Sequence, residues 1–332
     1  MITLKIDYER GGRQKDIYGE SEVVNVVCPL CDSDTYKKIY QERGALGVVQ
    51  CRSCGLIYVN PRLKNPEEVY WGDAEKYFKE ARLIFEGKAE HHRADNYQRD
   101  LKLIRRLKPA GNFLDVGTNV GFFLNYAKKN ERWNLFGVEP SPSLSSMAEK
   151  HFGLNITRSF LEDAGFEDNF FDVITMTDVF EHITNPDKIL RESRRILKPD
   201  GVLFIKVPNG LFNIFKFNLA RITGRLSKYD IFDSYEHVVH YSGNTLKKML
   251  KRNGFTVVNM NIGSPIQLPV WHKFVGQYYQ YKCPWALDYK RQSARTFLYY
   301  LSKAESGLRL GKIGYLAPNI IALAKKTAKG LA

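Results

Sequence analysis

Short apolar segments and amphipathic segments alternate along the middle of the chain. Each apolar run has the length of a strand, and most of these runs are followed by apolar residues at helical spacing. This alternation is typical of a doubly wound α/β sheet whose strands are largely parallel. The strands predicted in this way are 112–116, 135–139, 154–157, 171–177, 202–207 and 255–261.

Start and stop signals flank several of the predicted helices. A helix within 88–107 ends before Pro109, and Asn185-Pro186 begins a helix after the fourth strand. Ser242 is expected to cap a helix that Gly254 ends. These helices would cover the faces of the sheet.

The turn after the first predicted strand consists of small residues. Gly117 and Gly121 would let the backbone approach a ligand closely, and Asn119 tolerates a positive φ better than most residues. Backbone amides at the start of the following helix could then hold a negative group such as a carboxylate. The turn therefore predicts a nucleotide-binding loop.

Two acids identify the class of nucleotide. Glu139 ends the second strand, where a carboxylate can accept both hydroxyls of a ribose. The NAD fingerprint is not met, because Asn119 and Phe122 occupy two of its glycine positions. Asp115 would repel a pyrophosphate but suits a cationic α-amino group. A nucleoside that carries an amino acid, S-adenosylmethionine, fits this pair.

With these residues, the chain resembles the class I S-adenosylmethionine-dependent methyltransferases. The resemblance covers roughly residues 90–262 and continues through the motifs at 171–176, 178–182, 196–205 and 207–209. It implies a Rossmann-like seven-stranded methyltransferase sheet, with residues 320–324 as an antiparallel seventh strand. It also implies cofactor contacts from Asp115, Gly117, Asn119, Gly121, Glu139, Pro140, Thr177, Asp178 and Val179.

The adenine contact departs from the family pattern. The family often has an aspartate after the third strand, where this chain has Phe160. We expect the Phe160 ring to contact the purine and the backbone amide of Leu161 to read the base edge.

Four cysteines near the N-terminus are paired in sequence. Cys28 and Cys31 form one C-x-x-C pair, and Cys51 and Cys54 form another after nineteen intervening residues. This spacing predicts a closed four-cysteine site that binds a structural Zn²⁺, with redox pairs or chance as the alternatives. A zinc ribbon before such a core resembles bacterial and archaeal enzymes that act on sugars or polysaccharide precursors.

Four residues are candidates for acid–base chemistry. Glu181 and His182 follow the fourth strand, where His182 could be the general base or could only fix the loop, and Glu181 would orient a neighbour. His237 and His240 could face the acceptor from the opposite side or be structural.

The predicted organisation has five parts. The core is 110–263 plus 316–328, and segment 210–241 within it is either a lid over the substrate mouth or a helix packed on the core. The other parts are an N-terminal segment and zinc ribbon (1–62), connecting helices (63–109) and an aromatic, basic helical insertion (264–315).

The charge of the chain widens the choice of partner. The net charge is +14, and residues 264–332 contain eleven Lys and Arg residues against Asp288 and Glu305. Such a segment could contact anionic lipid, phosphorylated substrate or nucleic acid, or be a solvated face. No apolar run is long enough to cross a bilayer, so we expect a cytoplasmic protein with possible contact to the inner face of the membrane.

We therefore expect methyl transfer to a hydroxyl of a sugar or glycan precursor, nucleotide- or lipid-linked, by in-line displacement with a histidine base. Carbon or nitrogen acceptors remain alternatives. An RNA methyltransferase is a rival because a ribbon and positive charge can hold RNA. A non-catalytic S-adenosylmethionine-binding protein is another, because Asn119 and Phe160 depart from the family pattern.

Overall fold

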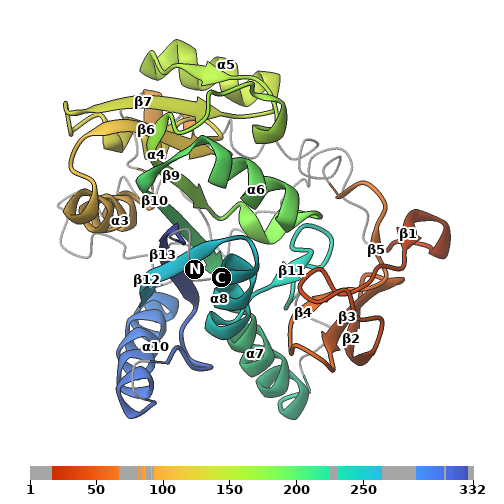
Figure 1. Ribbon diagram of the computed structural model, residues 1–332. Helices are drawn as coiled ribbons and strands as arrows, with labels where there is room; N and C mark the ends of the chain where they lie inside the picture. The colour runs from red at the N-terminus through yellow and green to blue at the C-terminus, as the bar shows by residue number, and fades with distance from the viewer. Residues whose placement is uncertain are drawn as a thin grey trace.

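The computed structural model describes residues 17–66, 81–82, 84–86, 91, 93–224, 231–263, 289–309 and 312–327 (Figure 1). The aromatic residues that the sequence places in 67–80 and 264–288, among them Trp71 and Trp271, lie outside these ranges. The predicted connecting helices (63–109) and helical insertion (264–315) are therefore described only in part.

A seven-stranded sheet forms the centre of the molecule (Figure 1). Its strand order is β12-β13-β10-β9-β6-β7-β8, and only β13 runs antiparallel to its neighbours. The bounds are β6 Gly111–Val116, β7 Trp133–Val138, β8 Ile156–Thr157, β9 Phe171–Thr177, β10 Leu197–Pro208, β12 Phe255–Ile262 and β13 Asn319–Lys326. This confirms the predicted Rossmann-like sheet, including its antiparallel seventh strand. The fifth strand is longer than predicted, because β10 begins directly at the end of helix α6.

Helices cover both faces of this sheet. The pleat sends Phe113 and Leu114 to opposite faces, and each belongs to a different apolar cluster. One cluster includes residues of α3 (Ala94–Leu107), α4 (Phe122–Ala127) and α5 (Pro142–Phe152), and the other includes residues of α6 (Pro186–Ile196) and α8 (Gly243–Arg252). The other helices in the described residues are α7 (Gly210–Ile222), α10 (Tyr289–Leu308) and the 3-10 turns η1 (Glu20–Glu22), η2 (Leu161–Asp163) and η3 (Phe180–His182).

The predicted helix boundaries rest on visible caps. The Asn185 side chain accepts the backbone amide of Lys188 at 3.2 Å, and Ser242 accepts that of Thr245 at 3.2 Å. Gly254 follows α8 with φ +75°, a conformation that favours glycine. Helix α3 starts at Ala94, so the part of 88–107 before it is not regular helix where the structure describes it.

The segment predicted to be a zinc ribbon, from here on called the ribbon, is joined to the core through a shared sheet. Strands β2 (Tyr36–Glu42), β3 (Leu46–Cys51) and β4 (Ile57–Val59) form an antiparallel sheet, and β11 (Val239–His240) from the core adds to the edge of β4 (Figure 1). Two shorter strands, β1 (Val23–Val24) and β5 (Arg62–Leu63), pair beside it. Cys28, Leu30 and Tyr58 share an apolar cluster with core residues. The N-terminal strands therefore pack directly on the core of the chain.

Among the described helices, none is both long enough and apolar enough to cross a bilayer.

Candidate functional site

The glycine loop lies between the end of β6 and the start of α4. Gly117, Asn119 and Gly121 all have positive φ, at +71°, +55° and +87°. A Cβ on Gly117 would lie 2.6 Å from Cγ2 of Val179, so glycine lets the loop approach the segment that follows β9. The loop and the end of β9, both predicted to line the ligand, are thus in contact.

Asp115, the residue before the last in β6, carries a buried carboxylate. Its Oδ1 accepts a hydrogen bond from the hydroxyl of Thr175 on β9 at 2.7 Å. Burial raises the pKa of Asp115 to about 7, and the nearby Glu139 carboxylate adds to this rise while the Thr175 bond opposes it. A cationic group placed at Asp115 would stabilise its ionised form.

Glu139 follows β7 and is enclosed by the protein. Its Oε2 accepts the backbone amide of Asn119 at 2.8 Å, and its Oε1 accepts that of Ser141 at 2.9 Å. Burial raises the pKa of Glu139, and these two amides oppose the rise. The carboxylate therefore fixes the glycine loop, and each oxygen keeps a second lone pair that can accept a further hydrogen bond.

Asp115 and Glu139 lie on the same face of the sheet. Asp115 pairs in register with Gly137 on the adjacent parallel strand, and Glu139 comes two residues after Gly137. Because side chains alternate along a strand, Asp115, Gly137 and Glu139 point to one side. The Glu139 carboxylate also helps to raise the pKa of Asp115, so the two carboxylates lie near each other. One ligand that contacts both carboxylates, as the sequence predicts, needs this arrangement.

The carboxyl end of β9 supplies three more predicted contacts. The buried Oγ1 of Thr177 has no hydrogen-bond partner among the described residues. Asp178 has φ +54°, donates its amide to the carbonyl of Lys206 at 2.9 Å, and pairs its carboxylate with the guanidinium of Arg93. Val179 then leads into η3.

The predicted adenine contacts lie after β8. Phe160 is 44% exposed and Leu161 is buried in the core. Pro140, after Glu139, is partly exposed. The Phe160 ring is therefore accessible to a ligand, and its role as an adenine contact stays a prediction.

Glu181, His182 and His237 come together from two distant segments. Their ligand atoms all lie within 4.8 Å of one another. Glu181 is 2% exposed, and its carboxylate oxygens have no hydrogen-bond partner on another described residue. Burial raises the pKa of Glu181 to about 8, with its own backbone amide and Arg93 lowering it and Glu236 raising it.

His182 is oriented by the segment that carries His237. Its Nδ1 lies 3.0 Å from the backbone carbonyl of Glu236. A carbonyl only accepts, so Nδ1 holds the proton and Nε2 carries the basic lone pair. The rings of His182 and His237 meet edge to face, with centroids 4.7 Å apart.

The structure does not bring His240 into this cluster. Its ring packs edge-on against Phe232, and its Nδ1 lies 3.4 Å from the side-chain nitrogen of Asn213. Burial lowers the pKa of His240 to about 3, and Lys216 adds to this effect. A histidine with so low a pKa is a poor proton acceptor near neutral pH.

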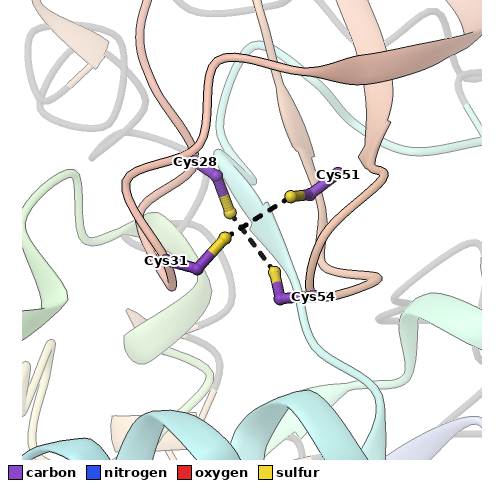
Figure 2. Close-up of side chains that lie close together, drawn as sticks. All are labelled: Cys28, Cys31, Cys51 and Cys54. Carbon is purple, nitrogen blue, oxygen red and sulfur yellow. Dashed lines mark hydrogen bonds between the residues drawn. The ribbon is translucent and has the colours of Figure 1, made fainter.

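The four cysteines form a separate centre, and Figure 2 shows their side chains pointing toward one another. Their sulfur atoms all lie within 4.8 Å, with Cys28–Cys54 and Cys31–Cys51 each 3.5 Å apart. Four thiolates around zinc at bond lengths of about 2.3 Å would lie roughly 3.8 Å apart. The geometry therefore fits a tetrahedral metal site.

Three residues that contact or support the site were not identified from the sequence. Arg93 pairs with Asp178, and Thr175 donates to Asp115. Glu42 at the end of β2 accepts hydrogen bonds from the amides of Ile231, Phe232 and Ser234 and from the Ser234 hydroxyl. All three contacts join positions far apart in sequence, so no local motif could signal them.

Apart from the four cysteines, the residues of the candidate site lie in a region that matches one protein family. Residues 89–260, slightly more than half of the chain, match the family model described as a methyltransferase domain.

Curated relatives align over the same region. An uncharacterized protein of Methanocaldococcus jannaschii is 27% identical over 144 residues, which are 43% of this chain and 61% of that protein. The ubiquinone/menaquinone biosynthesis C-methyltransferase UbiE of Shewanella pealeana is 30% identical over 119 residues, which are 32% of this chain and 47% of that enzyme. The chain thus spans about half the length of the curated relatives it matches.

Solved structures include similar chains at low identity. A Thermotoga maritima protein described as an S-adenosylmethionine-dependent methyltransferase, possible histamine N-methyltransferase, is 17% identical with a TM-score of 0.47. The match covers 79% of this chain and 100% of that one.

Proposed function

Because the chain belongs to the methyltransferase domain family, we propose that it is an S-adenosylmethionine-dependent methyltransferase that methylates a hydroxyl of a sugar or glycan precursor. The observation that carries this proposal is the cluster of Glu181, His182 and His237 beside the end of β9. It puts a basic nitrogen next to the segment expected to line the methyl donor.

The residues around the glycine loop fit the cofactor. Asp115 offers a buried carboxylate for the α-amino group, and Glu139 offers lone pairs for the ribose hydroxyls. The unpartnered hydroxyl of Thr177 is a further polar atom that a ligand could satisfy. These observations support the predicted cofactor contacts.

The bound cofactor supplies an electrophilic methyl group on a sulfonium. The residues of the chain then orient the acceptor, exclude water and remove a proton. In this proposal Nε2 of His182 accepts the hydroxyl proton, and the Glu236 carbonyl at 3.0 Å from Nδ1 stabilises the resulting imidazolium. Glu181 and His237 position the hydroxyl.

The choice of a sugar acceptor rests on the ribbon. Four cysteines in tetrahedral arrangement, packed on a methyltransferase core, support the resemblance to enzymes of sugar and polysaccharide precursors. The same arrangement supports Zn²⁺ as the structural metal. A carbon acceptor is the second candidate, because the UbiE relatives are described as C-methyltransferases.

We also propose that the precursor is nucleotide- or lipid-linked and that the protein works in the cytoplasm, at times against the inner membrane surface. Helix α10 supports this proposal, because it exposes Phe297, Tyr300 and Leu308 on a segment that also carries Lys303 and Arg309.

Mass spectrometry and NMR of cell-surface glycan from a deletion strain test the acceptor. We expect the glycan of the deletion strain to carry one methyl ether fewer than the glycan of the parent strain. Expression of the wild-type chain should restore this methyl ether. Expression of the Asp115→Asn variant should not restore it, because this variant should not bind the cofactor. A missing C-methyl group would favour the second candidate, and an unchanged glycan would contradict both.

A further inference from the structure

We propose that Glu181, His182 and His237 bind one divalent cation, which takes an oxygen of the acceptor as a further ligand. The inference rests on the proposed function for the place of the acceptor. It adds to that function a cofactor that neither the family model nor the ribbon provides.

The three side chains already converge. Their ligand atoms lie within 4.8 Å of one another, although Glu181 and His182 come from η3 and His237 comes from a segment more than fifty residues later. Ligands at right angles around a cation, with bonds of about 2.0–2.2 Å, lie roughly 3 Å apart. The ligand atoms would therefore have to move closer together to bind one ion.

Glu181 provides the independent sign of a missing ligand. Its carboxylate is buried, and neither oxygen has a hydrogen-bond partner on another described residue. A buried carboxylate without a partner is costly, and a coordinated cation removes that cost. The arrangement is thus more than a group of acids at the surface.

His182 has the outer contact expected of a metal ligand. Its Nδ1 donates to the Glu236 carbonyl at 3.0 Å, which fixes the tautomer and leaves the lone pair on Nε2. Because His237 is the next residue after Glu236, the same short segment orients one histidine and supplies the other.

The surrounding charges permit a cation. Arg93 acts on Glu181 as a positive charge, but its guanidinium pairs with Asp178. Glu236 acts on Glu181 as a negative charge from the other side. The positive charge facing the cluster is therefore compensated.

The ligand set selects the class of ion. Two imidazoles and one carboxylate favour Mn²⁺, Fe²⁺, Co²⁺ or Zn²⁺ over Mg²⁺ and Ca²⁺, which prefer oxygen ligands. Three protein ligands leave positions open for the acceptor. An acceptor with two neighbouring oxygens, such as a sugar diol, would chelate the ion through both.

The cation changes how the hydroxyl loses its proton. A coordinated hydroxyl is more acidic, so its proton passes to water and the electron pair of the O–H bond stays on oxygen. That oxygen then forms the bond to the methyl carbon as the carbon–sulfur bond breaks and its electron pair goes to sulfur. With the ion bound, the histidines act as ligands rather than as the base.

Mn²⁺ alone is the probe that tests this site in the full-length protein with its ribbon loaded with Zn²⁺. Mn²⁺ prefers oxygen and nitrogen ligands, so it should not displace zinc from four thiolates. Electron paramagnetic resonance of free Mn²⁺ measures binding, and spin-echo modulation detects the bound imidazole nitrogens. We expect one Mn²⁺ per chain coupled to two imidazoles.

Variants identify the ligands. Glu181→Gln and His237→Gln should each weaken Mn²⁺ binding at least about tenfold, and His237→Gln should leave one coupled imidazole. His151→Gln, at an exposed histidine on α5, should change neither the Mn²⁺ affinity nor the number of coupled imidazoles. Circular dichroism checks folding, and Glu181→Asp, which keeps a carboxylate, should recover part of the affinity.

Absence of Mn²⁺ binding to the folded wild type, or binding that survives both variants, would overturn the cation site. Methyl transfer to the hydroxyl could then still proceed with His182 as the base. Conversely, Mn²⁺ binding together with an unchanged glycan in the deletion strain would contradict the proposed acceptor and leave the cation site standing.

Discussion

The hydroxyl of Thr175 donates a 2.7 Å hydrogen bond to Oδ1 of Asp115 across the neighbouring strands β9 and β6. It is the one hydrogen bond to the Asp115 side chain among the described residues, and it only partly offsets burial. A carboxylate held in this way is poised for a cationic ligand. The free-energy cost of burying this carboxylate in the ligand-free protein can be measured.

Asp115→Asn should stabilise the ligand-free protein at alkaline pH. The folded pKa of Asp115 is raised from 3.8 to about 7, so the folded state keeps a proton that the unfolded chain has lost between these values. Stability from this group is present below pH 4, falls as pH rises to 7, and stays lost above. At pH 8 the variant should gain about 2–4 kcal/mol of unfolding free energy.

Urea unfolding from pH 5 to 9 checks this, with Asp168→Asn as a control at an exposed carboxylate that pairs with Arg195. A wild-type stability curve parallel to that of Asp115→Asn over the whole range would contradict it.

Arg93→Gln should weaken cofactor binding at little cost to folding. The Arg93–Asp178 pair is partly exposed, so its loss should cost at most about 1 kcal/mol of stability. It does, however, hold the carboxylate of Asp178, whose backbone has φ +54° beside the expected methyl-donor channel. We expect roughly fivefold weaker binding of S-adenosylmethionine.

Calorimetry with S-adenosylmethionine measures this affinity. Arg93→Lys, which keeps a positive charge, should lose less affinity than Arg93→Gln. Lys102→Gln, on the exposed side of α3, should leave the affinity unchanged. Unaltered affinity in Arg93→Gln would remove the pair from the binding site.

Glu42→Ala should disrupt the acceptor side of the site from the ribbon. The Glu42 carboxylate accepts four hydrogen bonds from 231–234, just before His237. Leaving these donors unpaired should cost about 3–5 kcal/mol. Turnover should fall while cofactor affinity persists. Gln41→Ala, at an exposed neighbour, is the control for chemical unfolding and methyl-transfer assays, and full turnover in Glu42→Ala would refute this anchoring role.

Removing the Zn²⁺ proposed for the four cysteines should loosen the segment that carries His237 as well as the ribbon. Strand β4 pairs with β11, two residues after His237. After chelation, hydrogen exchange should speed up in 46–59 and 238–241, while β6 and β9 remain protected. Slow exchange at 238–241 in the metal-free protein would show that the core holds β11 without the ribbon.

The sequence predicted the sheet well, because its signals are local. The run that ends in Asp115, the glycine turn and the caps at Asn185 and Ser242 each occupy a few consecutive residues. The positive φ expected of Asn119 is present for the same reason.

The parts of the site that were missed depend on distant partners. Nothing near Glu42 indicates that its carboxylate anchors 231–234, and nothing near Arg93 indicates Asp178. The sequence could not separate His237 from His240 either, because their difference depends on β11 joining the ribbon sheet. Tertiary pairing, rather than local pattern, selects which histidine meets His182.

The central claim is that Asp115 and Glu139 hold opposite ends of one adenosyl amino acid. Calorimetry with S-adenosylhomocysteine and with 5′-methylthioadenosine, which lacks the amino acid, tests it most directly. We predict that Asp115→Asn weakens the binding of S-adenosylhomocysteine only, whereas Glu139→Gln weakens the binding of both ligands to the same extent. Equal losses of both ligands in Asp115→Asn, or no binding of either ligand to the wild type, would contradict the account.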